Sequence, residues 1–99
     1  MNDCTGWIVR STAGHDKDEL FCVVGADPKT GRLLLANGKQ RKAARPKLKK
    51  PGHVQTLDRG EFDHPVIRKL QNKETVSDRA IRIALAAFKG GNESWQNTI

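Results

Sequence analysis

The sequence predicts a mostly β domain with helices at its C-terminal end: a small β-barrel of about five strands followed by two helices. Short apolar segments alternate with tight-turn signals over residues 6–57, which is typical of a small barrel. After Gly60 the apolar residues recur at helical spacing instead. The 99 residues suffice for one small core. We therefore expect a barrel over 1–60, a helical extension packed on it over 61–90, and a flexible tail over 91–99.

Five segments are candidate strands. They are residues 7–10, 20–26, 32–36, 39–44 and 53–57. The segment 20–26 is a continuous apolar run, which is typical of a strand covered on both faces. Asp27–Gly31 contains both Pro and Gly and predicts a tight turn. The dipeptide Asn37–Gly38 is typical of a two-residue hairpin turn of type I′, which makes 39–44 the return strand.

Residues 45–52 are expected to form an extended, exposed basic loop. Pro46 and Pro51 restrict the backbone, and neither has the amide hydrogen that a position inside a sheet needs. These two prolines exclude a helix or a central strand at this point of the chain.

Two helices are expected after the strands. The first begins at Asp63 or His64, directly before Pro65, and the second begins within 75–77 and ends at Gly90–Gly91. One side of the second helix is apolar, formed by Ala80, Ile81, Ala84, Leu85 and Phe88. This stripe either covers the barrel or binds a partner protein. We favour the first interpretation, because a barrel of about fifty residues is marginally stable alone.

The charge of the chain is concentrated in one segment. The formal net charge is +7, yet all nine basic residues from Lys29 to Lys50 lie in a stretch without a single acid between Asp27 and Asp58. The rest of the chain is close to neutral. Such a localised positive field attracts polyanions. A solvated loop, or a basic edge that prevents aggregation, is the alternative, and the missing acids favour binding.

Several function classes are disfavoured. The apolar runs are far shorter than the roughly 20 residues that span a bilayer, and residues 1–3 lack the features of a signal peptide. We therefore expect a cytoplasmic protein with no membrane partner, in which Cys4 and Cys22 are reduced. The cysteines and the three histidines lack metal-site spacing, so we expect no metal and no cofactor. Without a phosphate-binding glycine loop or a catalytic pattern, we expect no enzyme.

Three segments resemble a known family. The first is Gly6-Trp7-Ile8-Val9-Arg10-Ser11-x-x-Gly14-x-Asp16-Lys17, continued by Phe21-Cys22-Val23-Val24-Gly25. The second is Leu35-Ala36-Asn37-Gly38-Lys39-x-Arg41-Lys42, continued by Arg45-Pro46-Lys47-x-Lys49-Lys50. The third is Val76-Ser77-Asp78-x-x-Ile81-Arg82-x-Ala84-Leu85. Together they resemble bacterial KOW-domain RNA-binding proteins, which are similar to large-subunit ribosomal proteins of archaea and eukaryotes. The similarity departs at His15 and Asp18, where such proteins tend to have Arg and Gly.

The resemblance implies an SH3-like barrel that binds RNA, with ribosomal RNA or the ribosome as the leading partner. From the charge pattern, the expected phosphate contacts are Lys39, Arg41, Lys42, Arg45, Lys47, Lys49 and Lys50. A second patch, supported mainly by the resemblance, consists of Ser11, Gly14, His15, Asp16 and Lys17. The alternative is that this turn has only a structural role, in which Asp16 caps its own backbone.

Few aromatic side chains are available for stacking on bases, so we expect recognition of RNA shape and backbone. We also expect the protein to be a monomer. The alternative function is that of an SH3-like protein-interaction module in the transcription or translation machinery, since such barrels also bind proteins.

Overall fold

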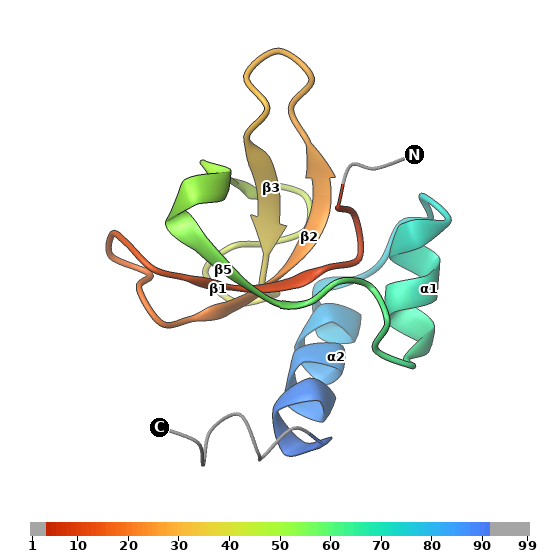
Figure 1. The fold of residues 1–99 in the computed structure, drawn as a ribbon. Coiled ribbons are helices and arrows are strands. Elements are labelled where there is room, and N and C mark those ends of the chain that lie inside the picture. Colours follow the sequence, from red (N-terminus) through yellow and green to blue (C-terminus); the bar gives the residue numbers. More distant parts are fainter. Residues whose placement is uncertain (1–3, 92–99) are drawn as a thin grey trace.

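A computed structural model describes residues 4–91 as a five-stranded antiparallel sheet with two helices (Figure 1). The elements are β1 (Ile8–Ser11), β2 (Leu20–Ala26), β3 (Leu33–Ala36), β4 (Lys47–Lys49), a 3-10 helix (Pro51–His53), β5 (Val54–Asp58), α1 (Pro65–Gln71) and α2 (Asp78–Gly91). The order of the strands in the sheet is β4-β3-β2-β1-β5. Apart from Gly91, the predicted tail lies outside the described residues.

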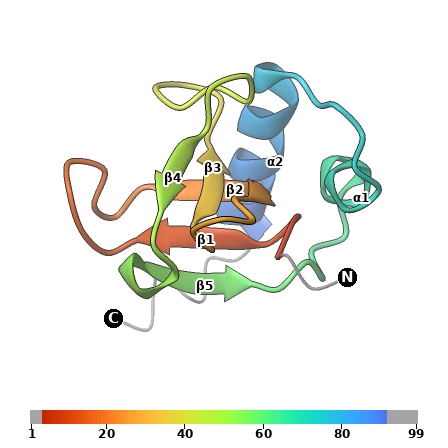
Figure 2. The same ribbon diagram turned by 90° about the horizontal axis from the view of Figure 1, so that it is seen from above.

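The sheet is strongly bent. In Figure 2, β4 runs across the direction of β1 and β5. β4 and β5 are the two edge strands of the sheet, yet the single 3-10 turn Pro51–His53 joins them. The bend therefore brings the two edges of the sheet together at this corner.

Four of the five predicted strands are confirmed within one residue at either end, and the prediction of a strand over 39–44 is wrong. A type I′ turn needs positive φ at both central residues, but only Gly38 of the Asn37–Gly38 pair has it, at 77°. The Asn37 side chain explains the difference. Its Oδ1 accepts hydrogen bonds from the backbone N of Lys39 (2.9 Å) and of Arg41 (3.1 Å). These bonds close a loop in place of a hairpin.

β4 lies where an exposed loop was expected. Its register with β3 pairs Leu33 with Lys49 and Leu35 with Lys47. Pro46 and Pro51 stand just outside these pairs, and β4 is an edge strand. The prolines therefore exclude a central strand, as expected, but they leave room for three residues of edge strand between them.

The sheet is covered by apolar groups on both faces, which confirms the interpretation of the run 20–26. Leu20 and Cys22 of β2 pack toward the helices, whereas Phe21 and Val23 pack on the opposite side. The cluster on the helix side includes Ile8, Leu20, Cys22, Ala36, Val66, Ile67, Leu70, Val76, Ile81, Ala84, Leu85 and Phe88. The cluster inside the bend is Val9, Phe21, Val23, Leu33 and Leu35. Alternate side chains of one strand thus serve two cores.

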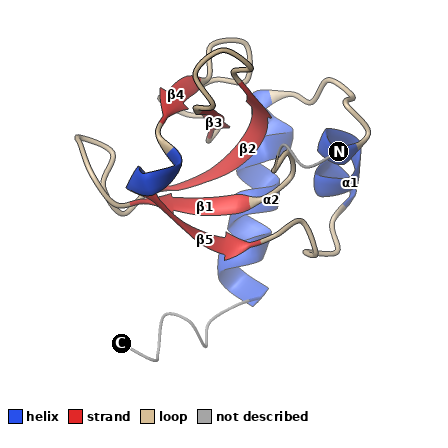
Figure 3. Cartoon of the chain, turned by 45° about the horizontal axis from the view of Figure 1, so that its top comes forward, coloured by secondary structure: helices blue, strands red, loops and turns tan. Residues whose placement is uncertain are grey.

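Both helices begin where the sequence predicts. His64 caps α1, since its Nδ1 accepts a hydrogen bond from Val66 N at 3.2 Å. Ser77 Oγ accepts one from Ala80 N at 3.1 Å at the start of α2. Figure 3 shows the strands in front of α2, with α1 beside it. The apolar stripe of α2 is buried against the sheet, so it covers the strands. In residues 4–91, no helix has the length and apolar character needed to cross a membrane.

Candidate nucleic-acid interface

Asp16, in the turn between β1 and β2, is the centre of a buried polar network. Its Oδ1 accepts hydrogen bonds from Ser11 Oγ at 2.8 Å and from Lys49 Nζ at 2.8 Å. Lys47 Nζ lies 3.5 Å from its Oδ2. Lys49 Nζ also donates to the carbonyl of Ala13 at 2.8 Å. The network therefore ties the turn to the edge strand β4, which lies more than thirty residues further along the chain.

The environment keeps Asp16 ionised. Burial by itself raises the pKa of this carboxyl, but the hydrogen bonds from Lys49 and Ser11 and the charges of Lys49 and Lys47 outweigh burial and lower its pKa to about 2. Two lysine ammonium groups and one carboxylate thus form a compact group with a net positive charge. Its geometry fixes where β4 lies relative to β1 and β2.

Three of the predicted RNA-contact residues are buried in this network. Ser11 is fully buried, Asp16 is 7% exposed and Lys49 is 6% exposed. Asp16 Oδ1 binds Ser11 and Lys49 inside the protein, while the buried Oδ2 faces Lys47 without a hydrogen bond. We assign these three residues a structural role in place of the expected contact. The alternative interpretation of this turn, a structural one, fits Asp16 best, although the partners of its carboxylate are the side chains of Ser11, Lys49 and Lys47.

The tip of the same turn is exposed. Gly14, His15 and Lys17 all face solvent. Gly14 has a φ of +88°, and a Cβ added there would lie 3.3 Å from Lys49 Nζ, so glycine lets the chain pass over the ion pair. Asp18 has a positive φ of 74°, a backbone conformation that favours Gly. The exposed part of this patch is therefore Gly14, His15 and Lys17.

Residues 37–46 form a different loop from the predicted one, and this loop packs on the first turns of α2. We call it the docked loop. Arg82 Nη1 donates to the carbonyl of Gly38 at 2.6 Å. Asp78 Oδ1 accepts a hydrogen bond from the backbone N of Ala43 at 2.7 Å. Gly38 approaches the helix so closely that an added Cβ would lie 2.3 Å from the Asp78 carbonyl oxygen. Side-chain hydrogen bonds to backbone groups therefore hold this loop, and its own cations are not used for the purpose.

The cations of the loop and of the residues after it are left available for a ligand. Lys39, Lys42, Arg45 and Lys50 are exposed and Arg41 is half-buried. None of these five side chains takes part in an ion pair in the described part of the chain. In contrast, Lys47 and Lys49 both face Asp16. Of the seven predicted phosphate contacts, five thus form the free basic surface, which we define as Lys39, Arg41, Lys42, Arg45 and Lys50.

Two residues that position this surface, Asn37 and Arg82, are not among the predicted site residues. Asn37 lies in what the sequence indicates is a hairpin turn, so its side-chain bonds to the loop were not expected. Arg82 lies four residues after Asp78, which puts both on one face of α2. That spacing could have indicated from the sequence that one face of α2 binds the loop, since Arg82 offers a hydrogen-bond donor and Asp78 an acceptor.

Comparison with known proteins adds no family assignment. No family model matches this chain, and no curated protein is significantly similar to it. Among residues 4–91, no group of three His, Cys, Asp or Glu side chains is placed to hold a metal ion. The resemblance to KOW-domain proteins therefore stays a prediction that rests on the residues quoted for it.

Proposed function

We propose that this chain is an RNA-binding domain that holds structured RNA through phosphate contacts from the free basic surface. The observation that carries the proposal is that five cations have no ion-pair partner among the described residues, four of them on the docked loop and the fifth, Lys50, directly after β4. Cations without an ion-pair partner are available for phosphate contacts, and each such contact releases counterions from the polyanion. The exposed tip of the β1–β2 turn, Gly14, His15 and Lys17, adds a second contact region.

Recognition of shape and backbone is favoured over recognition of bases. Phe21 and Phe88 are buried in the core. Trp7 is half-buried, and Arg59 lies over its ring, 5.6 Å from the centroid. Stacking platforms for unpaired bases are therefore scarce in the described part of the chain, whereas contacts to phosphates are available.

The fold agrees with the proposal at a coarse level. A bent five-stranded antiparallel sheet with an apolar interior, whose edge strands are joined by one 3-10 turn, supports the proposal of an SH3-like barrel. Such a barrel is what the resemblance to KOW-domain proteins implies. The same resemblance supports ribosomal RNA as the leading target, and the cytoplasm would then be the compartment.

The alternative, a protein-interaction module, depends on a surface that the helices would offer. The apolar stripe of α2 was the candidate, and Ile81, Ala84, Leu85 and Phe88 of that stripe are buried in the core. With this stripe covered, the free basic surface is the stronger basis for a function.

The salt dependence of binding tests the proposal. Five phosphate contacts predict a slope of about −4 for log K against log salt concentration, since each contributes about −0.7 to −0.9. We would measure fluorescence anisotropy of a labelled RNA hairpin between 50 and 300 mM salt. Replacing Lys42 and Lys50 with Ala should weaken binding to every RNA and reduce the slope by about 1.5.

The matched control removes two exposed lysines outside the free basic surface, Lys29→Ala with Lys69→Ala, and thus loses the same net charge. This control should keep most of the affinity. A slope near zero for the wild type, or equal losses in both double variants, would contradict the proposal. Crosslinking to RNA in cells followed by sequencing identifies the target, and enrichment of messenger RNA alone would exclude ribosomal RNA.

A further inference from the structure

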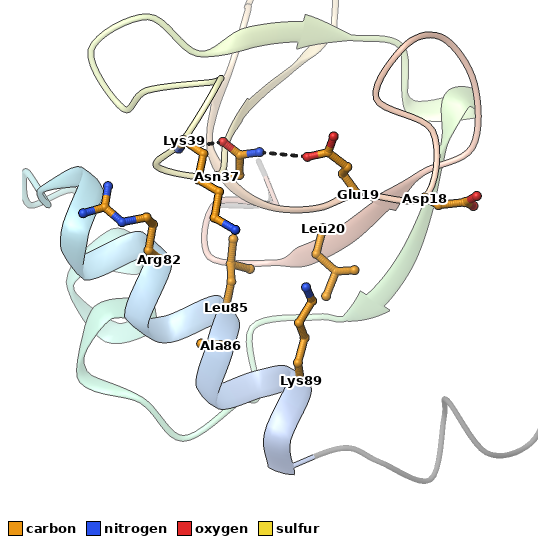
Figure 4. Close-up of a pocket in the computed structure, with 9 residues that line it drawn as sticks. All are labelled: Asp18, Glu19, Leu20, Asn37, Lys39, Arg82, Leu85, Ala86 and Lys89. Carbon is orange, nitrogen blue, oxygen red and sulfur yellow. Dashed lines mark hydrogen bonds between the residues drawn. The ribbon is translucent and has the colours of Figure 1, made fainter.

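A second positively charged feature lies beside the docked loop, in a cleft of about 210 Å³ between the start of β2 and α2 (Figure 4). Leu20 of β2 and Leu85 and Ala86 of α2 contribute an apolar floor. Lys39 enters from the loop and Lys89 from the last turn of the helix. Figure 4 shows that these two lysine side chains reach into the cleft from opposite walls, with their ends directed toward the same space.

The acidic residues at the rim of the cleft do not neutralise these two lysines. Asp18 forms an ion pair with Arg10 and points away from the cleft in Figure 4. Glu19 accepts a hydrogen bond from Asn37 Nδ2 at 3.3 Å. Neither Lys39 nor Lys89 belongs to an ion pair within residues 4–91. Two like charges are thus directed toward the same space over an apolar floor, where an anion between them would be attracted by both.

The walls of the cleft are held in place before any ligand arrives. Arg82, which lines the cleft by its position on α2, donates to the Gly38 carbonyl and so fixes the loop that carries Lys39. Leu20 and Leu85 are buried in the core. A site that is already formed loses less entropy on binding, which is consistent with a binding function.

We propose that this cleft binds one nucleotide of the RNA, with a phosphate between Lys39 and Lys89 and the base against Leu20, Leu85 and Ala86. This inference rests on the proposed function and adds a contact site on α2. RNA is favoured as the occupant because Lys39 belongs to both the free basic surface and the cleft, so one strand can pass from one to the other.

A matched pair of helix variants tests whether the cleft itself is occupied. Ala86 and Ala87 are neighbours on α2 and are both exposed, but of the two only Ala86 lines the cleft. Ala86→Leu fills the cleft with a good helix former and changes no charge. We expect it to weaken binding of a labelled single-stranded oligouridylate by about fivefold, because the base loses its apolar contact. Ala87→Leu should bind as the wild type does.

A second pair tests the phosphate contact. Lys89→Gln should reduce the slope of log K against log salt by about 0.7, the contribution of one phosphate on a single strand. Lys69→Gln, a control on α1, should leave the slope unchanged. Thermal unfolding of all four variants shows whether each is folded.

The outcomes separate this inference from the proposed function. If the wild type binds RNA and the Lys42→Ala/Lys50→Ala protein is weakened, but Ala86→Leu and Lys89→Gln both behave as the wild type, the cleft is not a nucleotide site and the function stands. If the wild type binds no RNA, both proposals fail. If an acidic peptide binds and Ala86→Leu abolishes that binding while RNA affinity is unchanged, the occupant is a protein and the inference is overturned.

Discussion

Lys49 and Lys50 are neighbours in the most basic segment of the chain, yet they serve opposite purposes. Lys49 is buried on β4 and donates to Asp16 and to the Ala13 carbonyl. Lys50 is exposed and takes part in no ion pair in the described residues. Lys47 and Lys49 stand two positions apart on a strand and therefore face the same side. The comparison shows that one run of basic residues contains both a buried structural pair and exposed cations without an ion-pair partner among the described residues.

The largest effect is expected from Lys49→Ala. The substitution leaves the carboxylate of Asp16 buried without its closest cation, and breaking a buried ion pair costs about 3–5 kcal/mol. Because Lys47 Nζ is 3.5 Å from Oδ2 and can move closer, we expect a loss of about 3 kcal/mol in the free energy of unfolding. Urea denaturation followed by circular dichroism measures it.

Lys50→Ala is the matched control for that substitution. It removes the same charge from an exposed position, so the free energy of unfolding should change by less than about 0.5 kcal/mol, while RNA affinity falls. If the two variants lost equal stability, the assignment of Lys49 to the interior and Lys50 to the binding surface would be wrong.

The docking of the loop on α2 predicts the second largest effect. Gly38→Ala puts a Cβ at a positive φ of 77° and 2.3 Å from the Asp78 carbonyl oxygen, so the backbone of the loop must shift. We expect a loss of about 2–3 kcal/mol in the free energy of unfolding. RNA affinity should also fall, because Lys39 and Arg41 lie one and three residues after Gly38 on the same loop.

Gly31→Ala is the control for strain alone. Gly31 has a φ of 73°, close to that of Gly38, but an added Cβ there would meet no atom within 4 Å. The expected loss is about 1 kcal/mol, with RNA affinity unchanged. Equal losses at the two glycines would mean that contact with α2 does not hold the loop.

How far the sequence predicts these features depends on the range of the interactions. The strand 20–26 and the caps at His64 and Ser77 follow from local patterns, because apolar run length and capping chemistry act over a few residues. The position of β4 does not follow from a local pattern. Its pairing with β3 and the ion pair to Asp16 join residues that are distant in the chain, and no local pattern marks Lys49 as different from Lys50.

The Asn37–Gly38 turn shows a second limit. Asn-Gly is equally compatible with a type I′ hairpin and with a loop closed by the Asn side chain. The choice is made by Arg82 and Asp78 on α2, which bind the Gly38 carbonyl and the Ala43 amide. Five of the seven predicted basic contacts nevertheless form the free basic surface. An excess of basic over acidic residues in a segment can be counted from the sequence, so this prediction needs no knowledge of contacts.

After the effects of Lys49→Ala and Gly38→Ala, the third and smallest effect on stability is the pH dependence that Asp16 contributes. In the folded protein the pKa of this carboxyl is about 2, below the ordinary Asp value of 3.8 that holds in the unfolded chain. The unfolded state therefore binds the proton first as pH falls, so the stabilisation is complete above about pH 4 and is lost as pH falls toward 2. The shift corresponds to about 2 kcal/mol, given 1.36 kcal/mol per pKa unit.

The test compares the wild type with Asp16→Asn in urea at a series of pH values from 6 to 2. Asn keeps the shape of the side chain but has no charge for Lys49. The wild type should be more stable at pH 6, and the difference in the free energy of unfolding should shrink by about 2 kcal/mol as pH approaches 2. Other carboxyls titrate in both proteins and cancel in the difference. A difference that stayed constant over this range would show that Asp16 acts through its hydrogen bonds alone and that its charge does not hold β4 in place.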